Sequence, residues 1–189
     1  MATKKRKATS RKPTARKAPV RATTTMRAIS PCLWFDSQAE EAARHYVSIF
    51  RKSRMGRITR YPAVGQEIHG QPAGKVMTAE FTLNGVEFLA LNGGPLFKFS
   101  ESVSFQVFCR DQKELDYYWQ KLGEGGDPRA QQCGWLKDKY GLSWQIVPEI
   151  MTKMMTSKGP GMERAFAAMM EMKKLDIAAL ERAFKGKAT

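Results

Sequence analysis

Cysteine is scarce in this sequence, and the three cysteines present (Cys32, Cys109 and Cys133) form no C-x-x-C pair. An odd number without paired spacing argues against a disulfide framework and against a zinc-finger site. Histidine is equally scarce, with two residues in 189. We therefore expect reduced thiols, which are typical of a cytoplasmic protein.

Long hydrophobic runs are also missing. No segment approaches the roughly 18 apolar residues that a membrane-spanning helix requires. The basic start of the chain is not followed by the apolar stretch of a secretory signal. An apolar content of 42% is nevertheless sufficient for a buried core. These features predict one soluble domain without membrane contact.

Acidic residues are absent from the first 25 positions, which contribute most of the net charge of +14. This segment has too little apolar surface to offset the entropy of folding, so residues 1–26 are predicted to form a disordered basic arm. Such an arm can bind nucleic acid or another polyanion non-specifically, through phosphate contacts. A solubilising tail or an upstream start codon is the preferred alternative. The basic residues of the arm are Lys4, Lys5, Arg6, Lys7, Arg11, Lys12, Arg16, Lys17 and Arg21.

After the arm, the apolar pattern predicts a strand, a helix and three further strands. Ser37 and Glu40 have the S-x-x-E spacing of a capping box at the start of the helix. Asn84-Gly85 suits the positive φ angles of a type I′ turn, which predicts a tight hairpin between the last two strands. The expected elements cover residues 29–35, 38–50, 54–61, 75–83 and 86–91, with a loop at 62–74.

A second unit then repeats this order. Residues 103–109 alternate between apolar and polar side chains, as a half-buried strand does. Asp111 and Glu114 repeat the capping-box spacing before a helix that buries Leu115, Tyr118, Trp119 and Leu122. Two strands follow, at 131–137 and 142–147. The repeat predicts an α+β domain of two βαβββ modules.

The composition changes once more after Pro148. Residues 150–155 are rich in methionine, and residues 162–184 have the apolar spacing of one long amphipathic helix. We expect this helix to pack on the domain or on a dimer partner. The predicted organisation is an arm at 1–26, a domain at 27–149 with modules at about 27–94 and 101–149, and a helical extension at 150–189.

Five stretches carry a family resemblance: S-F-Q-V-F-C at 104–109, Y-W-Q-K-L at 118–122, C-G-W-L-K-D-K-Y-G at 133–141, L-S-W-Q-I-V-P at 142–148 and M-K-K-L-D-I-A-A-L at 172–180. They resemble the PhnB-like branch of the vicinal-oxygen-chelate (glyoxalase/bleomycin-resistance) superfamily, often labelled 3-demethylubiquinone-9 3-methyltransferase. The resemblance covers about residues 28–184. It implies that two modules curl their sheets around a cleft, commonly in a homodimer.

In the metal-dependent members of that superfamily, four His, Glu or Gln side chains hold a divalent ion. Carried over to this chain, the ligand positions fall on Gln145, on Ser104, on one of Ser30, Cys32 and Trp34, and on Ala90 or Asn92. Only one of these four positions, Gln145, carries a plausible ligand, and one amide with a scatter of small polar groups holds Zn²⁺ or Fe²⁺ poorly. We therefore predict no metal, no other cofactor and no glyoxalase or dioxygenase chemistry.

The remaining prediction is a cleft lined by aromatic rings and amides. Such a lining suits a flat, partly polar organic ligand, held by stacking and oriented by hydrogen bonds. Trp119 and Trp144 are instead assigned to the core. Strand alternation places Cys32, Trp34, Asn92, Ser104, Gln106, Phe108, Cys133, Trp135 and Gln145 at the cleft.

Three functions are compatible with these features. The first is a metal-free small-molecule-binding protein, and the second is an enzyme of the same fold acting at the Gln106 and Gln145 cleft. A methyltransferase with a doubly wound donor site is not favoured, since Gly93-Gly94 and Gly125-Gly126 are placed as turns or helix stops. The third is a protein that associates with nucleic acid through its basic arm.

Overall fold

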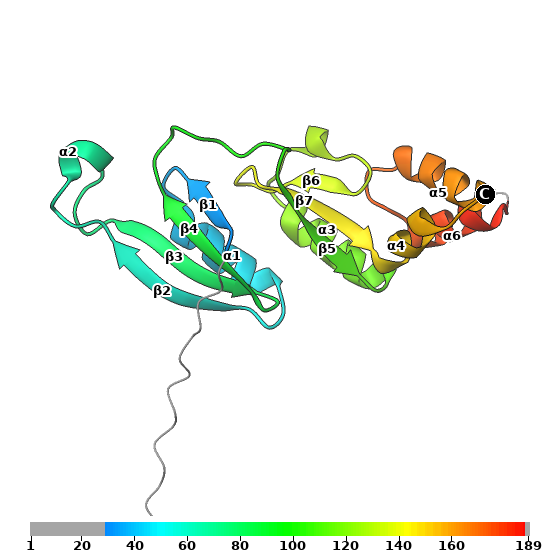
Figure 1. Ribbon diagram of the computed structural model, residues 1–189, viewed down its shortest axis with the longest axis horizontal. Helices are drawn as coiled ribbons and strands as arrows, with labels where there is room; N and C mark the ends of the chain where they lie inside the picture. Colours follow the sequence, from blue (N-terminus) through cyan, green and yellow to red (C-terminus); the bar gives the residue numbers. More distant parts are fainter. Residues whose placement is uncertain (1–28, 188–189) are drawn as a thin grey trace, which may run out of the picture.

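The computed structural model describes residues 29–187 and shows an α+β protein with two β-sheets (Figure 1). The nine basic residues of the predicted arm lie outside this range. In chain order the elements are β1 (Cys32–Phe35), α1 (Ala39–Ile49), β2 (Arg54–Arg60), α2 (Gln66–His69), β3 (Val76–Leu83), β4 (Val86–Asn92), β5 (Ser104–Cys109), α3 (Gln112–Gly123), a 3₁₀ turn (Pro128–Ala130), β6 (Trp135–Lys137), β7 (Ser143–Pro148), α4 (Glu149–Thr156), α5 (Pro160–Met170) and α6 (Ile177–Lys185).

The first sheet has the strand order β1-β4-β3-β2, with β1 parallel to β4 and the other pairs antiparallel. Asn84 (φ 47°) and Gly85 (φ 84°) both adopt positive φ at the β3–β4 turn. The expected type I′ hairpin is therefore confirmed. Helix α1 covers one face of this sheet, where alternate residues of β1, β3 and β4 are buried.

Helix α1 does not begin with the expected capping box. Its N-cap residue is Gln38, and no side chain of the cap itself closes the first turn. The backbone N–H of Ala39 instead donates to Oδ1 of Asn92, at 2.7 Å. The side chain of Asn92 also donates through Nδ2 to the carbonyl of Val76, at 3.0 Å. A residue at the end of β4 therefore satisfies a backbone donor in the first turn of α1, where the sequence pattern predicted a Ser37–Glu40 capping box.

The second sheet has the order β5-β7-β6, with β5 parallel to β7 and β6 antiparallel to it. The N-cap of α3 is as expected, because Asp111 accepts from the backbone N–H of Glu114 at 2.8 Å. This unit is βαββ within the described residues and not the expected βαβββ. The 3₁₀ turn Pro128–Ala130 stands where the first unit has β2, since a proline at its start cannot donate to a ladder.

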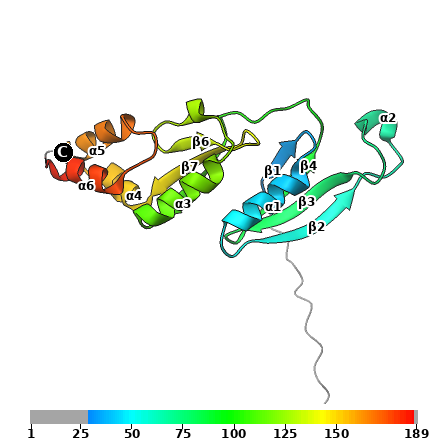
Figure 2. The same cartoon turned by 180° about the vertical axis from the view of Figure 1, so that it is seen from behind.

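Helices α1 and α3 lie on the same side of the two sheets, in front of them in Figure 2. One apolar core runs through both units. At their junction, Asp138 Oδ2 accepts from the hydroxyl of Tyr46 at 2.7 Å and from the indole N–H of Trp144 at 2.8 Å. The faces opposite the helices turn toward the viewer in Figure 1, so both sheets are open on the same side.

The single helix expected at 162–184 is wrong, because the structure divides it into α5 and α6. Leu175 is buried between them and beside Gly134, where an added Cβ would lie 3.1 Å from its side chain. Asp176 then caps α6 by accepting from the backbone N–H of Ala179 at 2.8 Å. Burial of one leucine and a new N-cap therefore interrupt the helical pattern. No helix between residues 29 and 187 combines the length and the apolar character needed to cross a membrane.

Candidate functional site

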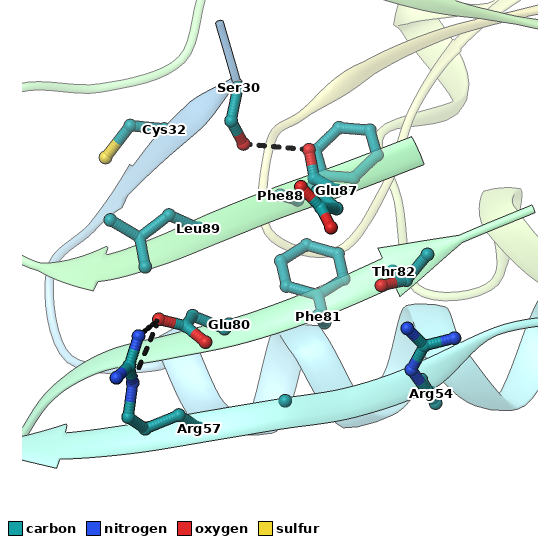
Figure 3. Close-up of a pocket in the computed structure, with 11 residues that line it drawn as sticks. Ser30, Cys32, Arg54, Arg57, Glu80, Phe81, Thr82, Glu87, Phe88 and Leu89 are labelled. Atoms are coloured by element: carbon teal, nitrogen blue, oxygen red, sulfur yellow. Dashed lines mark hydrogen bonds and ion pairs between the residues drawn. The ribbon is translucent and has the colours of Figure 1, made fainter. Parts of the chain in front are cut away.

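A cavity of about 710 Å³ lies on the open face of the first sheet (Figure 3). We call it the sheet pocket. Its volume falls in the range of sites for small organic ligands. All of its walls come from β1 to β4 and the residues just before β1. It is lined by Ser30, Cys32, Arg54, Gly56, Arg57, Glu80, Phe81, Thr82, Glu87, Phe88 and Leu89.

Strand register arranges part of this lining in a polar row. Arg54 on β2 pairs with Thr82 on β3, and Thr82 pairs with Glu87 on β4. Directly paired residues point to the same face of a sheet. The three side chains therefore form one row across the floor of the pocket, near the β3–β4 turn.

The neighbouring part of the floor is more apolar. Leu89 lies between Glu80 and Cys32 in the strand register. The carboxylate of Glu80 is occupied by an ion pair with Arg57, at 2.7 Å. Gly56 allows close approach of the strands, because a Cβ there would lie 2.9 Å from Cβ of Glu80. The floor thus offers a hydrophobic surface beside the polar row.

Cys32 and Trp34 are on the open face of β1, as the alternation predicted. Cys32 is exposed and lines the pocket. Partial desolvation by the surrounding protein raises the pKa of its thiol, which disfavours the nucleophilic thiolate. Trp34 lies one step beyond the lining. Its indole N–H donates to the carbonyl of Gly94 at 2.8 Å, and a Cβ on Gly93 would come within 2.2 Å of the indole ring.

The second sheet carries another group of predicted residues on its open face. Gln145 donates through Nε2 to the hydroxyl of Ser104 at 2.8 Å, and Gln106 donates to Oε1 of Gln145 at 3.3 Å. Trp135 pairs with Gln145 in the register of β6 and β7. We call these four residues the amide group. Phe108 lies on the same face and is 51% exposed.

The structure therefore does not unite the predicted residues in one cavity of a single chain. No member of the amide group lines the sheet pocket. The two sets lie on separate sheets, both open on the same side of the molecule (Figure 1). The sequence prediction found the open faces of the strands but did not separate the two sheets.

Two predicted site residues are placed elsewhere. Asn92 is 2% exposed and caps α1, so its placement in the cleft is wrong. The hydrogen-bond partners of its buried amide are backbone groups of Ala39 and Val76, so the amide does not point to the open face of the sheet. Cys133 lies in a bend at φ 50°, where its sulfur is 3.7 Å from the sulfur of Met170 at the end of α5. Trp144 belongs to the core, as expected, and Trp119 is partly buried and packs against the core.

The residues of the open faces do not fit a metal ion. Across residues 29–187, no group of three or more His, Cys, Asp and Glu side chains is arranged to hold one. The two histidines are not near the amide group. His45 packs against Tyr140, and burial lowers the pKa of its imidazole. His69 packs against Tyr61, at the α2 end of the first sheet.

The sequence prediction missed Arg54, Thr82 and Glu87. A signal for two of them was present, because a two-residue hairpin at Asn84-Gly85 sets Thr82 opposite Glu87. Arg54 was less accessible to prediction, since β2 contains register shifts that change which residues share a face.

Residues 27–147 match the family described as 3-demethylubiquinone-9 3-methyltransferase. The chain belongs to this family. Its α+β fold is that of the PhnB-like proteins, as the sequence resemblance implied.

Solved structures include a 3-demethylubiquinone-9 3-methyltransferase family PhnB protein from Bacillus cereus, which is 35% identical. It matches 65% of this chain and 99% of its own length, with a TM-score of 0.55. Protein PA1353 from Pseudomonas aeruginosa is 18% identical and matches 64% of this chain and 96% of its own length, with a TM-score of 0.49. A lactoylglutathione lyase from Agrobacterium tumefaciens is 13% identical and matches 66% of this chain and 96% of its own length, with a TM-score of 0.38. No curated protein matches the chain.

Proposed function

We propose that this member of the 3-demethylubiquinone-9 3-methyltransferase family is a small-molecule-binding protein that uses no metal ion. The ligand is an aromatic or partly polar organic compound. The observation that carries the proposal is the sheet pocket, whose apolar floor at Leu89 adjoins the polar row of Arg54, Thr82 and Glu87. An apolar surface supplies affinity, and a few polar groups at its margin supply orientation.

The donor chemistry of the open faces supports binding without a metal. Amides and hydroxyls at Gln145, Gln106 and Ser104 already satisfy one another by hydrogen bonds. They suit an organic ligand with donor and acceptor groups better than they suit Zn²⁺ or Fe²⁺. The family name refers to methyl transfer, but Gly93-Gly94 follows a strand without opening a helix, and Gly125-Gly126 follows α3. Neither has the setting of a glycine-rich nucleotide turn.

We also propose that the protein acts as a homodimer. The open face of the second sheet carries Phe108, which is 51% exposed, and Val103, the residue just before β5, is 62% exposed. An exposed aromatic ring on a sheet face that no helix covers is a surface that a second copy of the chain could bury. Light scattering should then give twice the chain mass of 21.3 kDa.

The binding proposal is tested by calorimetric titration with a set of aromatic compounds, using the variants Leu89→Glu and Val86→Glu. Leu89→Glu places a charge on the pocket floor, so binding should weaken at least about tenfold, which corresponds to about 1.4 kcal/mol. Val86 is 44% exposed and does not line the pocket, so Val86→Glu should bind as the natural chain does. Equal binding by all three proteins, or no binding of any aromatic compound, would overturn the proposal.

Metal independence is tested on the same protein, purified without chelator. Elemental analysis should find well under one equivalent of any divalent metal, and chelator should leave both ligand affinity and melting temperature unchanged. A stoichiometric ion whose removal abolishes binding would show that the metal-free part of the proposal is wrong. Gln145 would then be the first ligand to replace.

A further inference from the structure

Two charged side chains of the sheet pocket have no partner among residues 29–187. The guanidinium of Arg54 makes no hydrogen bond or ion pair with the described residues, and neither does the carboxylate of Glu87. The hydroxyl of Ser30 donates to the backbone carbonyl of Glu87, not to its carboxylate. The nearby Arg57 and Glu80 differ, because they pair with each other at 2.7 Å. Arg57 and Glu80 therefore form an ion pair within the pocket, whereas Arg54 and Glu87 do not.

The strand register explains why Arg54 and Glu87 do not form an ion pair. Arg54 and Glu87 lie on β2 and β4, and Thr82 on β3 separates them. Adjacent strands are about 4.8 Å apart, so the two Cα atoms are separated by roughly 10 Å. Figure 3 shows both side chains reaching toward β3 from opposite sides. Their charged atoms do not come within ion-pairing distance, which leaves a space above the Thr82 hydroxyl.

The balance of charge in the pocket restricts what can occupy this space. The lining contains two arginines and two glutamates, and the Arg57–Glu80 pair neutralises itself. A purely anionic ligand at Arg54 would lie close to the unpaired carboxylate of Glu87. A purely cationic ligand at Glu87 would lie close to the guanidinium of Arg54. A group that carries both charges satisfies both side chains at once.

We propose that the sheet pocket recognises a zwitterionic head group of the α-amino-acid type attached to an aromatic body. This inference rests on the proposed binding function and specifies its ligand class. Arg54 donates to the carboxylate, for which its planar guanidinium is well suited. Glu87 accepts from the ammonium group, and the aromatic body lies on Leu89.

The test is a calorimetric titration of the full chain with four compounds that share a phenyl ring. Phenylalanine carries both charges, 3-phenylpropanoate only the negative one, 2-phenylethylamine only the positive one, and 3-phenylpropanamide neither. Phenylalanine should bind at least about tenfold more tightly than each of the other three, since only it pairs both side chains. Equal affinity for all four would overturn the zwitterion inference and leave the binding function standing. Failure of all four, together with a wider aromatic set, would contradict the binding function itself.

Two charge-neutral variants assign the contacts. Arg54→Gln should reduce phenylalanine affinity to that of 2-phenylethylamine, and Glu87→Gln should reduce it to that of 3-phenylpropanoate. The matched control is Arg44→Gln on α1, which breaks an exposed ion pair with Glu40 on the other side of the sheet. It should bind all four compounds as the natural chain does. Both pocket residues are on the surface of the sheet, so melting temperatures of the variants should agree closely. Unchanged preference for phenylalanine in Arg54→Gln and Glu87→Gln would also overturn the inference.

Discussion

Cys109 shows how strongly burial changes the chemistry of one side chain in this protein. It is fully buried at the end of β5, and its thiol donates to the carbonyl of Val107 at 3.6 Å. Burial, with smaller contributions from Glu114 and Asp111, raises the pKa of this thiol to about 12. The group is therefore protonated in the folded protein at any physiological pH, and it is not a nucleophile.

This shift predicts a pH-dependent stability. The thiol of an unfolded chain ionises near pH 8.5, whereas folded Cys109 keeps its proton until about pH 12. Between these values the folded state binds more protons, so the free energy of unfolding falls as pH rises. Cys109→Ala removes this term. Urea unfolding should show the free energy of unfolding of the natural chain falling by about 2 kcal/mol relative to that of Cys109→Ala from pH 8 to pH 10. A difference that stays constant with pH would contradict the shift.

At the scale of single elements, helix α1 depends on a group that is distant in sequence. The Asn92 amide links the first turn of α1 to the carbonyl of Val76, and so ties the helix to two strands. Helix ends need partners for their free N–H groups, and a buried end without one is costly. The position of α1 on the sheet is therefore set partly from β4.

Replacing Asn92 by Ala should lower the free energy of unfolding by about 2 kcal/mol, because a buried N–H and a partly buried carbonyl both lose their partner. The matched control is Ser37→Ala, which removes the hydroxyl that the sequence pattern assigned to the cap. It should cost less than about 0.5 kcal/mol. Denaturant unfolding at neutral pH measures both. A larger loss for Ser37→Ala than for Asn92→Ala would show that the capping assignment is wrong.

Elements defined by neighbouring residues were predictable from the sequence, and those defined by distant contacts were not. Asn84-Gly85 and the Asp111 cap act within four residues, so the pattern identified both. The cap from Asn92 crosses 53 residues. The break between α5 and α6 depends on the burial of Leu175 beside Gly134, which no helical periodicity reveals.

At the scale of the whole molecule, the two units are held together by buried polar contacts as well as by the core. The carboxylate of Asp138 accepts four hydrogen bonds, two from side chains (Tyr46 and Trp144) and two from the backbone N–H groups of Tyr140 and Leu142. Tyr46 belongs to α1 and the other donors to the second unit. The pKa of Asp138 is nevertheless raised, because the cost of burial exceeds the stabilisation by these donors.

Tyr46→Phe should therefore lower the free energy of unfolding by about 2 kcal/mol, since it removes a hydrogen bond to a buried carboxyl group. Tyr117→Phe is the matched control. Its hydroxyl donates to the carbonyl of Ile49 at a partly exposed site, so its loss should cost about 0.5 kcal/mol. Tryptophan fluorescence and circular dichroism should report one common transition, because the core is continuous. Two separate transitions in the natural chain would show that the units unfold independently.

The candidate site was only partly predictable for a reason that also belongs to this scale. Alternation within a strand tells which side chains share a face, and it correctly grouped Ser104, Gln106 and Gln145. It does not tell which sheets meet. Cys32 and Trp34 were therefore assigned to the same cleft, although they lie on the other sheet. The charged row at Arg54 depends on the register of three strands, which is a property of the folded sheet.

The contact between Gly93 and Trp34 also restricts the order in which this sequence can change. With the indole in place, any side chain at position 93 would overlap it, since the added Cβ falls 2.2 Å from the ring. A smaller residue at position 34 would remove that steric overlap, but the hydrogen bond from the indole N–H to the Gly94 carbonyl would be lost. Descendants of this chain can therefore acquire a side chain at 93 only after position 34 has changed. The reverse order passes through an intermediate that cannot keep the present arrangement of β1.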